Sequence, residues 1–169
     1  GIREPGLYNH FPHKQALYEA VLQQVLNPLA QSLSQHIEGA SGLRDYTDLP
    51  AVMTDLMLTH PHMAALLQQA LLDDTQSPGN QLVMQWLDRL FNQGMQNMEA
   101  LGVTDSRNAG DNDRANQAIN VIALLNVTTG YFLAERTFAT LTGGDLLNSD
   151  NINRQKRMLH RVMRAMLIS

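Results

Sequence analysis

The chain opens with GIREPGLYNHFPHK, residues 1–14, and the rest of the sequence is organised around this stretch. Pro5 suits the first turn of a helix, because its ring fixes φ and the N–H that it lacks has no partner there. Pro12 then makes extension of the same helix unfavourable. One flank of this short helix is apolar, with Ile2, Leu7 and Phe11, and the other carries hydrogen-bonding groups. The stretch therefore predicts a brief helix with one side packed inward and a polar side left outside.

These residues resemble the end of the helix-turn-helix unit of the tetracycline-repressor (TetR-type) transcriptional regulators. In that family a glycine and a hydrophobic residue open the recognition helix, Leu-Tyr-x-His-Phe closes it, and a lysine follows three residues after the phenylalanine. The pattern is matched position by position, over a small part of the chain, by Gly1-Ile2, Leu7-Tyr8-Asn9-His10-Phe11 and Lys14.

The resemblance implies two parts: the end of a DNA-binding domain at 1–14 and an all-helical ligand-binding and dimerisation domain at 15–169. It also implies that the short helix enters the major groove of operator DNA, reading base edges with some residues and holding phosphates with others. The implied base-edge residues are Glu4, Pro5, Gly6 and Asn9, the implied phosphate residues are Tyr8, His10 and Lys14, and Arg3 belongs to the same DNA-binding set.

The chemistry of these side chains fits that division. A lysine or a tyrosine can hold phosphate and so position the protein, whereas Asn9 or Glu4 can pair with base edges and so select sequence. Gly6 departs from the family pattern, in which Thr, Ser or Ala is more usual, and the base specificity is therefore left open.

The first two helices of a helix-turn-helix unit are not in this sequence, which begins at Gly1. A recognition helix without its supporting helices has nothing to fix its angle in the groove. We therefore expect the truncated unit to bind DNA weakly or not at all, and expect specific operator binding only of an intact chain.

Composition narrows the class of protein further. The 169 residues are 44% hydrophobic, enough for one sizeable core, and the absence of cysteine excludes disulfides, thiolate metal sites and a cysteine nucleophile. A formal net charge of −4 means that any affinity for DNA is local to the N-terminal end. No apolar run approaches the ~18 residues of a membrane span and no signal peptide is visible, so we expect a cytoplasmic protein without a membrane partner.

Apolar residues at helical spacing predict an all-α fold throughout. Pro28 lies inside the first long helix, where we expect a kink near Gln24 to Asn27, either as a simple bend or as a hinge between the DNA-reading end and the body. The expected helices run over 13–37, from Asp48 to His60, from Pro61 to Asp73, from Pro78 to Leu101, over 114–141, and from a cap at Asp150 over 151–169.

The last two expected helices carry excess apolar surface, as helices of an intermolecular four-helix bundle do, and the resemblance implies this homodimer. A glycine in the middle of the longer helix permits close approach by another helix. The predicted interface residues are Gly130, Phe138, Met158, Val162 and Met166.

A small, apolar ligand is expected among the helices of the body, although the nine methionines also serve as ordinary core filler. The predicted ligand-binding residues are Met53, Met57, Leu67, Trp86, Leu90 and Asn126.

No metal or cofactor is predicted. His60 and His62 form a His-x-His pair but lack a third ligand at helical spacing, and the stretch from Asp111 lacks the glycine and glutamate of a calcium loop. No nucleophile elbow, P-loop, dinucleotide fingerprint or zinc-protease motif is present, so we do not expect an enzyme. The sequence thus predicts a ligand-responsive DNA-binding regulator, with a repressor released by a small molecule as the expected form. The alternative is an all-α dimeric small-molecule-binding or interaction protein that does not bind DNA.

Overall fold

The computed structural model describes residues 13–60, 62–102 and 111–167, and this part of the chain is all-α, as predicted. Of the predicted DNA-binding residues, Lys14 lies within the described residues. The others lie outside them: Arg3, Glu4, Pro5, Gly6, Tyr8, Asn9 and His10. The helices are α2 (Lys14–Glu38), α3 (Leu43–Tyr46), α4 (Leu49–Thr59), α5 (Met63–Leu72), α6 (Pro78–Ala100), α7 (Asp111–Leu133), α8 (Glu135–Thr142) and α9 (Ser149–Leu167).

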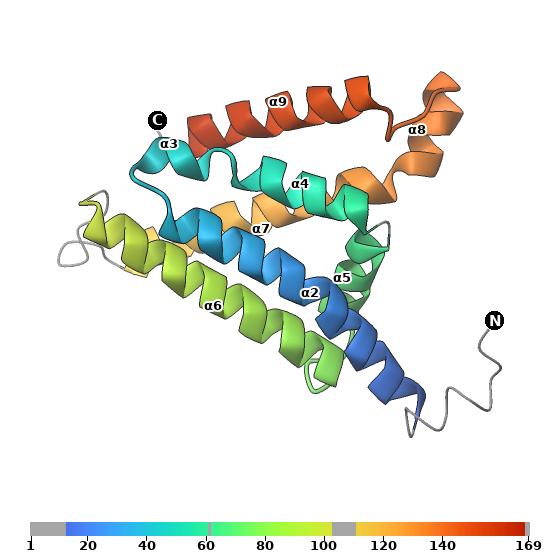
Figure 1. The fold of residues 1–169 in the computed structure, drawn as a ribbon, viewed down its shortest axis with the longest axis horizontal. Helices are drawn as coiled ribbons and strands as arrows, with labels where there is room; N and C mark the ends of the chain where they lie inside the picture. The colour runs from blue at the N-terminus through green and yellow to red at the C-terminus, as the bar shows by residue number, and fades with distance from the viewer. Residues whose placement is uncertain (1–12, 61, 103–110, 168–169) are drawn as a thin grey trace.

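Helices α2 and α6 lie side by side and form the most extensive helix pair in the described part (Figure 1). Helix α4 packs against both α2 and α9, and α5 packs between α6 and α7. The main core lies where α2, α4, α5 and α6 meet, and its fully buried side chains include Leu22, Leu29, Met57, Leu67 and Val83.

The buried face of α2 differs in part from the expected one. The observed stripe is Leu22, Leu26, Leu29, Leu33 and Ile37, each three or four residues from the next, as one helix face requires. The helical spacing of Leu17, Ala20, Val21 and Val25 predicts that these residues face the core. Before Pro28, the observed stripe falls one residue later, and Val21 is exposed. Helix α2 is unbroken across Pro28, and the hinge at that residue stays a prediction.

Several helix ends follow the predicted local signals. His60 ends α4, and Gly102, at φ 69°, follows the end of α6. Ser77 caps α6, its hydroxyl accepting from the backbone N–H of Asn80 at 3.2 Å, and Pro78 is the first residue of that helix. These ends were predictable because proline, serine and glycine act on the backbone beside them.

The starts of α5 and α9 differ from prediction, and one expected loop contains a short helix. Helix α5 begins at Met63, two residues after the expected Pro61, and the expected loop before Asp48 contains the short helix α3. Asp48 occupies the N-cap of α4 without a capping hydrogen bond from its side chain. Helix α9 begins earlier than Asp150, because the side-chain oxygen of Asn148 accepts from the N–H of Asn151 at 2.9 Å.

The single long helix expected over 114–141 is wrong: α7 and α8 are separate helices bent by 59°. Ala134 lies at the bend with φ −90° and ψ 6°, and its N–H bonds to the carbonyl of Tyr131 at 3.1 Å. Tyr131, on α7 before the bend, donates its hydroxyl to the carbonyl of Leu146, in the segment after α8, at 2.7 Å. The helical pattern of the sequence does not indicate this contact. No single helix of the described ranges is long and apolar enough to cross a membrane; α7 and α8 reach that length and composition only when they are taken together across the bend.

Gly79 marks the closest approach of α6 to α2 at the end of this pair. A Cβ at Gly79 would lie 2.6 Å from Cε1 of Tyr18 on α2, inside any real contact distance. We expect Gly79→Ala to lower the free energy of unfolding by about 1–3 kcal/mol in urea titrations, because overpacking forces the ring to move.

The matched control is Gly94→Ala in the middle of the same helix, where a new Cβ meets nothing within 4 Å. This variant should be stabilised by about 0.5–1 kcal/mol, the usual gain of alanine over glycine in a helix. Equal effects at the two glycines would contradict the close approach of Tyr18 and Gly79.

Candidate ligand cavity

A partly open cavity of about 160 Å³ lies in the body, lined by side chains of α2, α3, α4, α6, α7 and α9. Its wall is mainly aliphatic, aromatic and methionine side chains, so an apolar molecule is the natural occupant. The wall consists of Leu33, Ile37, Tyr46, Leu49, Pro50, Met53, Trp86, Leu87, Leu90, Phe91, Gly94, Met95, Met98, Gln117, Asn120, Val121, Leu124, Leu125, Thr128, Met163, Met166 and Leu167.

Helix α6 supplies the largest share of this wall with one face. Its lining residues recur in adjacent pairs four positions apart, from Trp86-Leu87 through Leu90-Phe91 to Gly94-Met95, which is the spacing of one side of a helix. Gly94 has no side chain to fill the space, and nothing lies within 4 Å of the position where its Cβ would be. The periodicity of α6 therefore shapes one side of the cavity.

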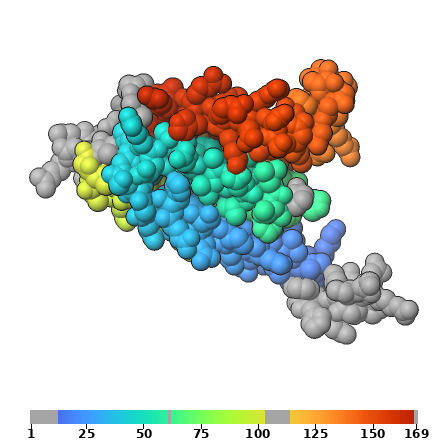
Figure 2. Space-filling view, turned by 45° about the horizontal axis from the view of Figure 1, so that its top comes forward, coloured from blue at the N-terminus to red at the C-terminus, as the bar shows by residue number. Residues whose placement is uncertain are grey.

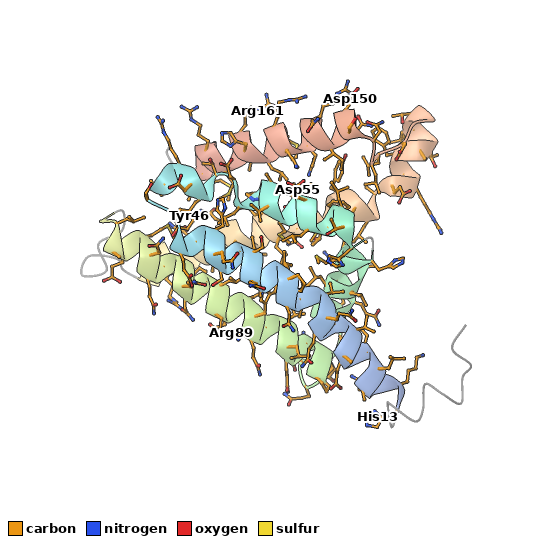
Figure 3. All side chains as sticks on the ribbon, in the orientation of Figure 1. His13, Tyr46, Asp55, Arg89, Asp150 and Arg161 are labelled. Carbon is orange, nitrogen blue, oxygen red and sulfur yellow. The ribbon has the colours of Figure 1, made fainter. Side chains whose placement is uncertain are left out.

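The lining residues include no Asp, Glu, His, Lys or Arg in the part of the chain that the structure describes. Tyr46, labelled in Figure 3, is one of the polar members; its hydroxyl donates to the carbonyl of Gly94 at 3.4 Å and accepts from the Asn97 side chain at 3.0 Å. The same Asn97 amide nitrogen donates to the carbonyl of Ile37 at 2.6 Å, which ties α6 to the ends of α2 and α3. Burial raises the pKa of the Tyr46 phenol, so this hydroxyl is uncharged at neutral pH.

Two polar atoms of the wall are buried without a hydrogen-bond partner: Nε1 of Trp86 and Oγ1 of Thr128. Such atoms are uncommon in folded proteins, because each one forfeits its bonds to water. The neighbouring Thr129 is also fully buried, but its hydroxyl donates to the carbonyl of Leu125 at 2.7 Å and accepts from the Gln68 side chain at 3.1 Å. Two further buried atoms without a partner in the described part of the chain, the Tyr18 hydroxyl and the Gln155 amide nitrogen, belong to residues outside this wall.

This contrast predicts opposite outcomes for two threonine variants in thermal or urea unfolding. We expect Thr129→Val to lower the free energy of unfolding by about 1–3 kcal/mol, because the half-buried Gln68 amide loses its acceptor at a fully buried hydroxyl. Thr128→Val should be nearly neutral or stabilising, since valine has the same shape and no polar atom to satisfy. A larger loss at Thr128 than at Thr129 would show that the Thr128 hydroxyl has a partner after all.

Three of the six predicted ligand residues line the cavity: Met53, Trp86 and Leu90. Met57 and Leu67 are almost completely buried in the core and lie outside the wall. Asn126 is exposed on α7, on the side away from the cavity, so this prediction is wrong.

The polar residues that α7 turns to the cavity are Gln117, Asn120 and Thr128. Because α7 is apolar on more than one side, its hydrophobic pattern does not indicate which face turns inward. Tyr46 was missed because it lies in a segment expected to be a loop. The contributions of α2 and α9 depend on long-range packing, for which the sequence offers no local signal.

The predicted dimer residues do not share one environment. Gly130, Phe138 and Met158 are half-buried and Val162 is exposed, whereas Met166 lines the cavity within one protomer. The interface itself stays a prediction.

Helix α9 covers the cavity from one side and is held on α4. Figure 2 shows α9 packed against α3 and α4 on one face of the molecule. The Lys156 ammonium pairs with the Asp55 carboxylate, and Nδ1 of His160 lies 3.2 Å from the carboxylate of Asp48. Exposed pairs of this kind contribute little energy, so Met163 and Leu159 in the buried stripe of α9 provide most of the attachment.

Within the described ranges, no three His, Asp, Glu or Cys side chains lie together so that they could bind one metal ion. Comparison of the chain with protein-family models, with curated proteins and with solved structures found no match. The resemblance to the TetR type therefore depends on the matching residues at 1–14 alone.

Proposed function

We propose that this chain is the ligand-binding and dimerisation part of a TetR-type transcriptional regulator, a DNA-binding repressor that a small molecule releases. The observation that carries the proposal is the apolar cavity inside an all-helical body that follows directly after the TetR-like motif. An ordinary packed core has few voids larger than a water molecule, so a cavity of this size supports a ligand-binding role. The cytoplasmic location expected from the sequence belongs to this proposal, because operator DNA is found there.

Helix α2 is the element that joins the motif to the cavity. It begins at Lys14, where Nδ1 of the N-cap residue His13 accepts from the N–H of Ala16 at 3.1 Å, and its other end contributes Leu33 and Ile37 to the cavity wall. A ligand that displaces this end of α2 thereby changes the position of its DNA-proximal end. A ten- to hundredfold change in DNA affinity requires a difference of about 1.4–2.8 kcal/mol in ligand affinity between the two arrangements.

The DNA-binding half of the proposal is tested in a protein that carries a whole helix-turn-helix unit ahead of α2, on DNA that this protein selects from a random pool. Lys14→Ala should weaken binding to all sequences alike and reduce the slope of log affinity against log salt by about one, because one phosphate contact is lost. The matched control is Arg161→Ala, which removes an equal charge from the outer side of α9 (Figure 3) and should leave the slope unchanged.

An equal change of slope in both variants would assign the salt dependence to overall charge and would contradict a phosphate contact at Lys14. Selection of no DNA sequence at all would favour the alternative, an all-α small-molecule-binding protein that uses the same cavity without DNA.

A further inference from the structure

We infer that the cavity takes a neutral, mostly apolar molecule of the size of a small aromatic compound, with a hydrogen-bond acceptor for the unpaired donor of Trp86 or of Thr128. This inference deepens the proposed function and rests only on its ligand-binding half.

The neutrality of the ligand follows from the wall. Among the described residues that line the cavity, the polar side chains are amides, hydroxyls and an indole, and none carries a charge to pair with an ion. Moving an unpaired charge out of water into such a place costs far more free energy than apolar contacts return. A charged ligand therefore finds no counter-charge among the described lining residues.

The acceptor follows from the two unpaired wall atoms. The indole Nε1 of Trp86 can only donate a hydrogen bond, and the hydroxyl of Thr128 can donate one as well. Both atoms belong to residues of the same cavity wall, whereas the Tyr46 hydroxyl in that wall already has partners. A carbonyl, ester or ether oxygen supplies the lone pair that such a donor requires. A ligand whose acceptor reaches either donor removes the cost of an unsatisfied atom when it binds.

The size of the ligand follows from the volume. The cavity of about 160 Å³ is close to the ~150 Å³ of an engineered apolar cavity that binds benzene. Five methionines in the wall (Met53, Met95, Met98, Met163 and Met166) allow it to adapt, since their side chains are unbranched and flexible.

Three probes of nearly equal size separate these properties: acetophenone, which is neutral with an acceptor; cumene, which has the same shape without one; and benzoate, which is an anion. Calorimetric titration of the 169-residue protein should give acetophenone about fivefold tighter binding than cumene, as one net hydrogen bond provides. Benzoate should bind at least about tenfold more weakly than acetophenone.

Two variants assign the preference to the named atoms. Trp86→Phe removes the indole N–H and Thr128→Val removes the hydroxyl, and at least one of the two variants should reduce the preference for acetophenone over cumene while cumene binding persists. Thr129→Val is the matched control, because the Thr129 hydroxyl is paired with Leu125 and Gln68. The Thr129→Val protein should prefer acetophenone over cumene as strongly as the unchanged protein does. Cumene binding to each variant reports an intact cavity, so a folding failure in one variant leaves the other as the test.

Equal binding of acetophenone and cumene to the unchanged protein, or a preference that survives both Trp86→Phe and Thr128→Val, would overturn the acceptor. Benzoate as the tightest of the three probes would overturn neutrality, and binding of none of them would overturn the cavity as a site for small aromatic compounds. No DNA is present in these titrations, so their failure is distinct from a failure of operator binding.

Discussion

Trp86→Ala is expected to lower the free energy of unfolding by about 3–5 kcal/mol, the cost of replacing a large buried aromatic side chain by alanine. Trp86 is almost completely buried and belongs both to the main core and to the cavity wall. Its removal merges the space of the indole with the existing cavity, and a cavity that grows without collapsing is the costly case. Urea titration followed by far-UV circular dichroism measures the loss, since the substitution removes the only tryptophan from the sequence.

The control for this prediction is Met84→Ala, two residues earlier on the same helix, where the side chain is 50% exposed. We expect a change within about 0.5 kcal/mol there, as is usual at the surface. Similar losses for the two variants would contradict the burial of Trp86. A small loss for Trp86→Ala alone would show that the helices collapse into the vacated space.

The sequence predicted most of the fold because the signals for helix ends are local. Ser77 with Pro78, His60 before Pro61, and Gly102 each act on the backbone next to them, and the corresponding ends lie where expected. The bend at Ala134 had no such signal, since neither a proline nor a glycine occupies that position. What fixes it is the packing of the segment that follows, including the hydrogen bond from Tyr131 to Leu146.

The cavity was predictable only in part for the same reason. Met53, Trp86 and Leu90 lie on the inward faces of strongly patterned helices, so periodicity sufficed to select them. Asn126 was misplaced because α7 has apolar residues on opposite sides, and either side satisfies a helical pattern equally well. Tertiary packing, not local preference, decided that Gln117, Asn120 and Thr128 face the cavity.

The second apolar side of α7 bears on the homodimer that forms part of the proposed function. Of the ten large apolar residues exposed in the described part of the chain, four belong to α7 and lie outside the cavity wall: Ile119, Ile122, Val127 and Leu133. Concentration of such residues on one helix is typical of a surface that another protein covers. A second copy of the chain is the partner that the proposed function provides, and we expect α7 to contribute to an interface between two copies related by a two-fold axis.

We therefore expect Ile122→Glu to raise the dissociation constant of the dimer by at least about 100-fold, corresponding to roughly 3 kcal/mol, because it leaves a carboxylate buried without a partner. Ile122 is 56% exposed in a single protomer, so the variant should fold normally. Sedimentation equilibrium measures the dissociation constant, and Leu72→Glu on α5 is the control, since this side chain is even more exposed (83%) and lies on another helix.

Gly130→Leu is a second test of the same interface. Nothing lies within 4 Å of a new Cβ at Gly130 within the protomer, so a weakened dimer in that variant reports a clash with the partner. If Ile122→Glu leaves the dimer as stable as Leu72→Glu does, the exposed side of α7 is not the interface, and the pairing must use another face of the bundle.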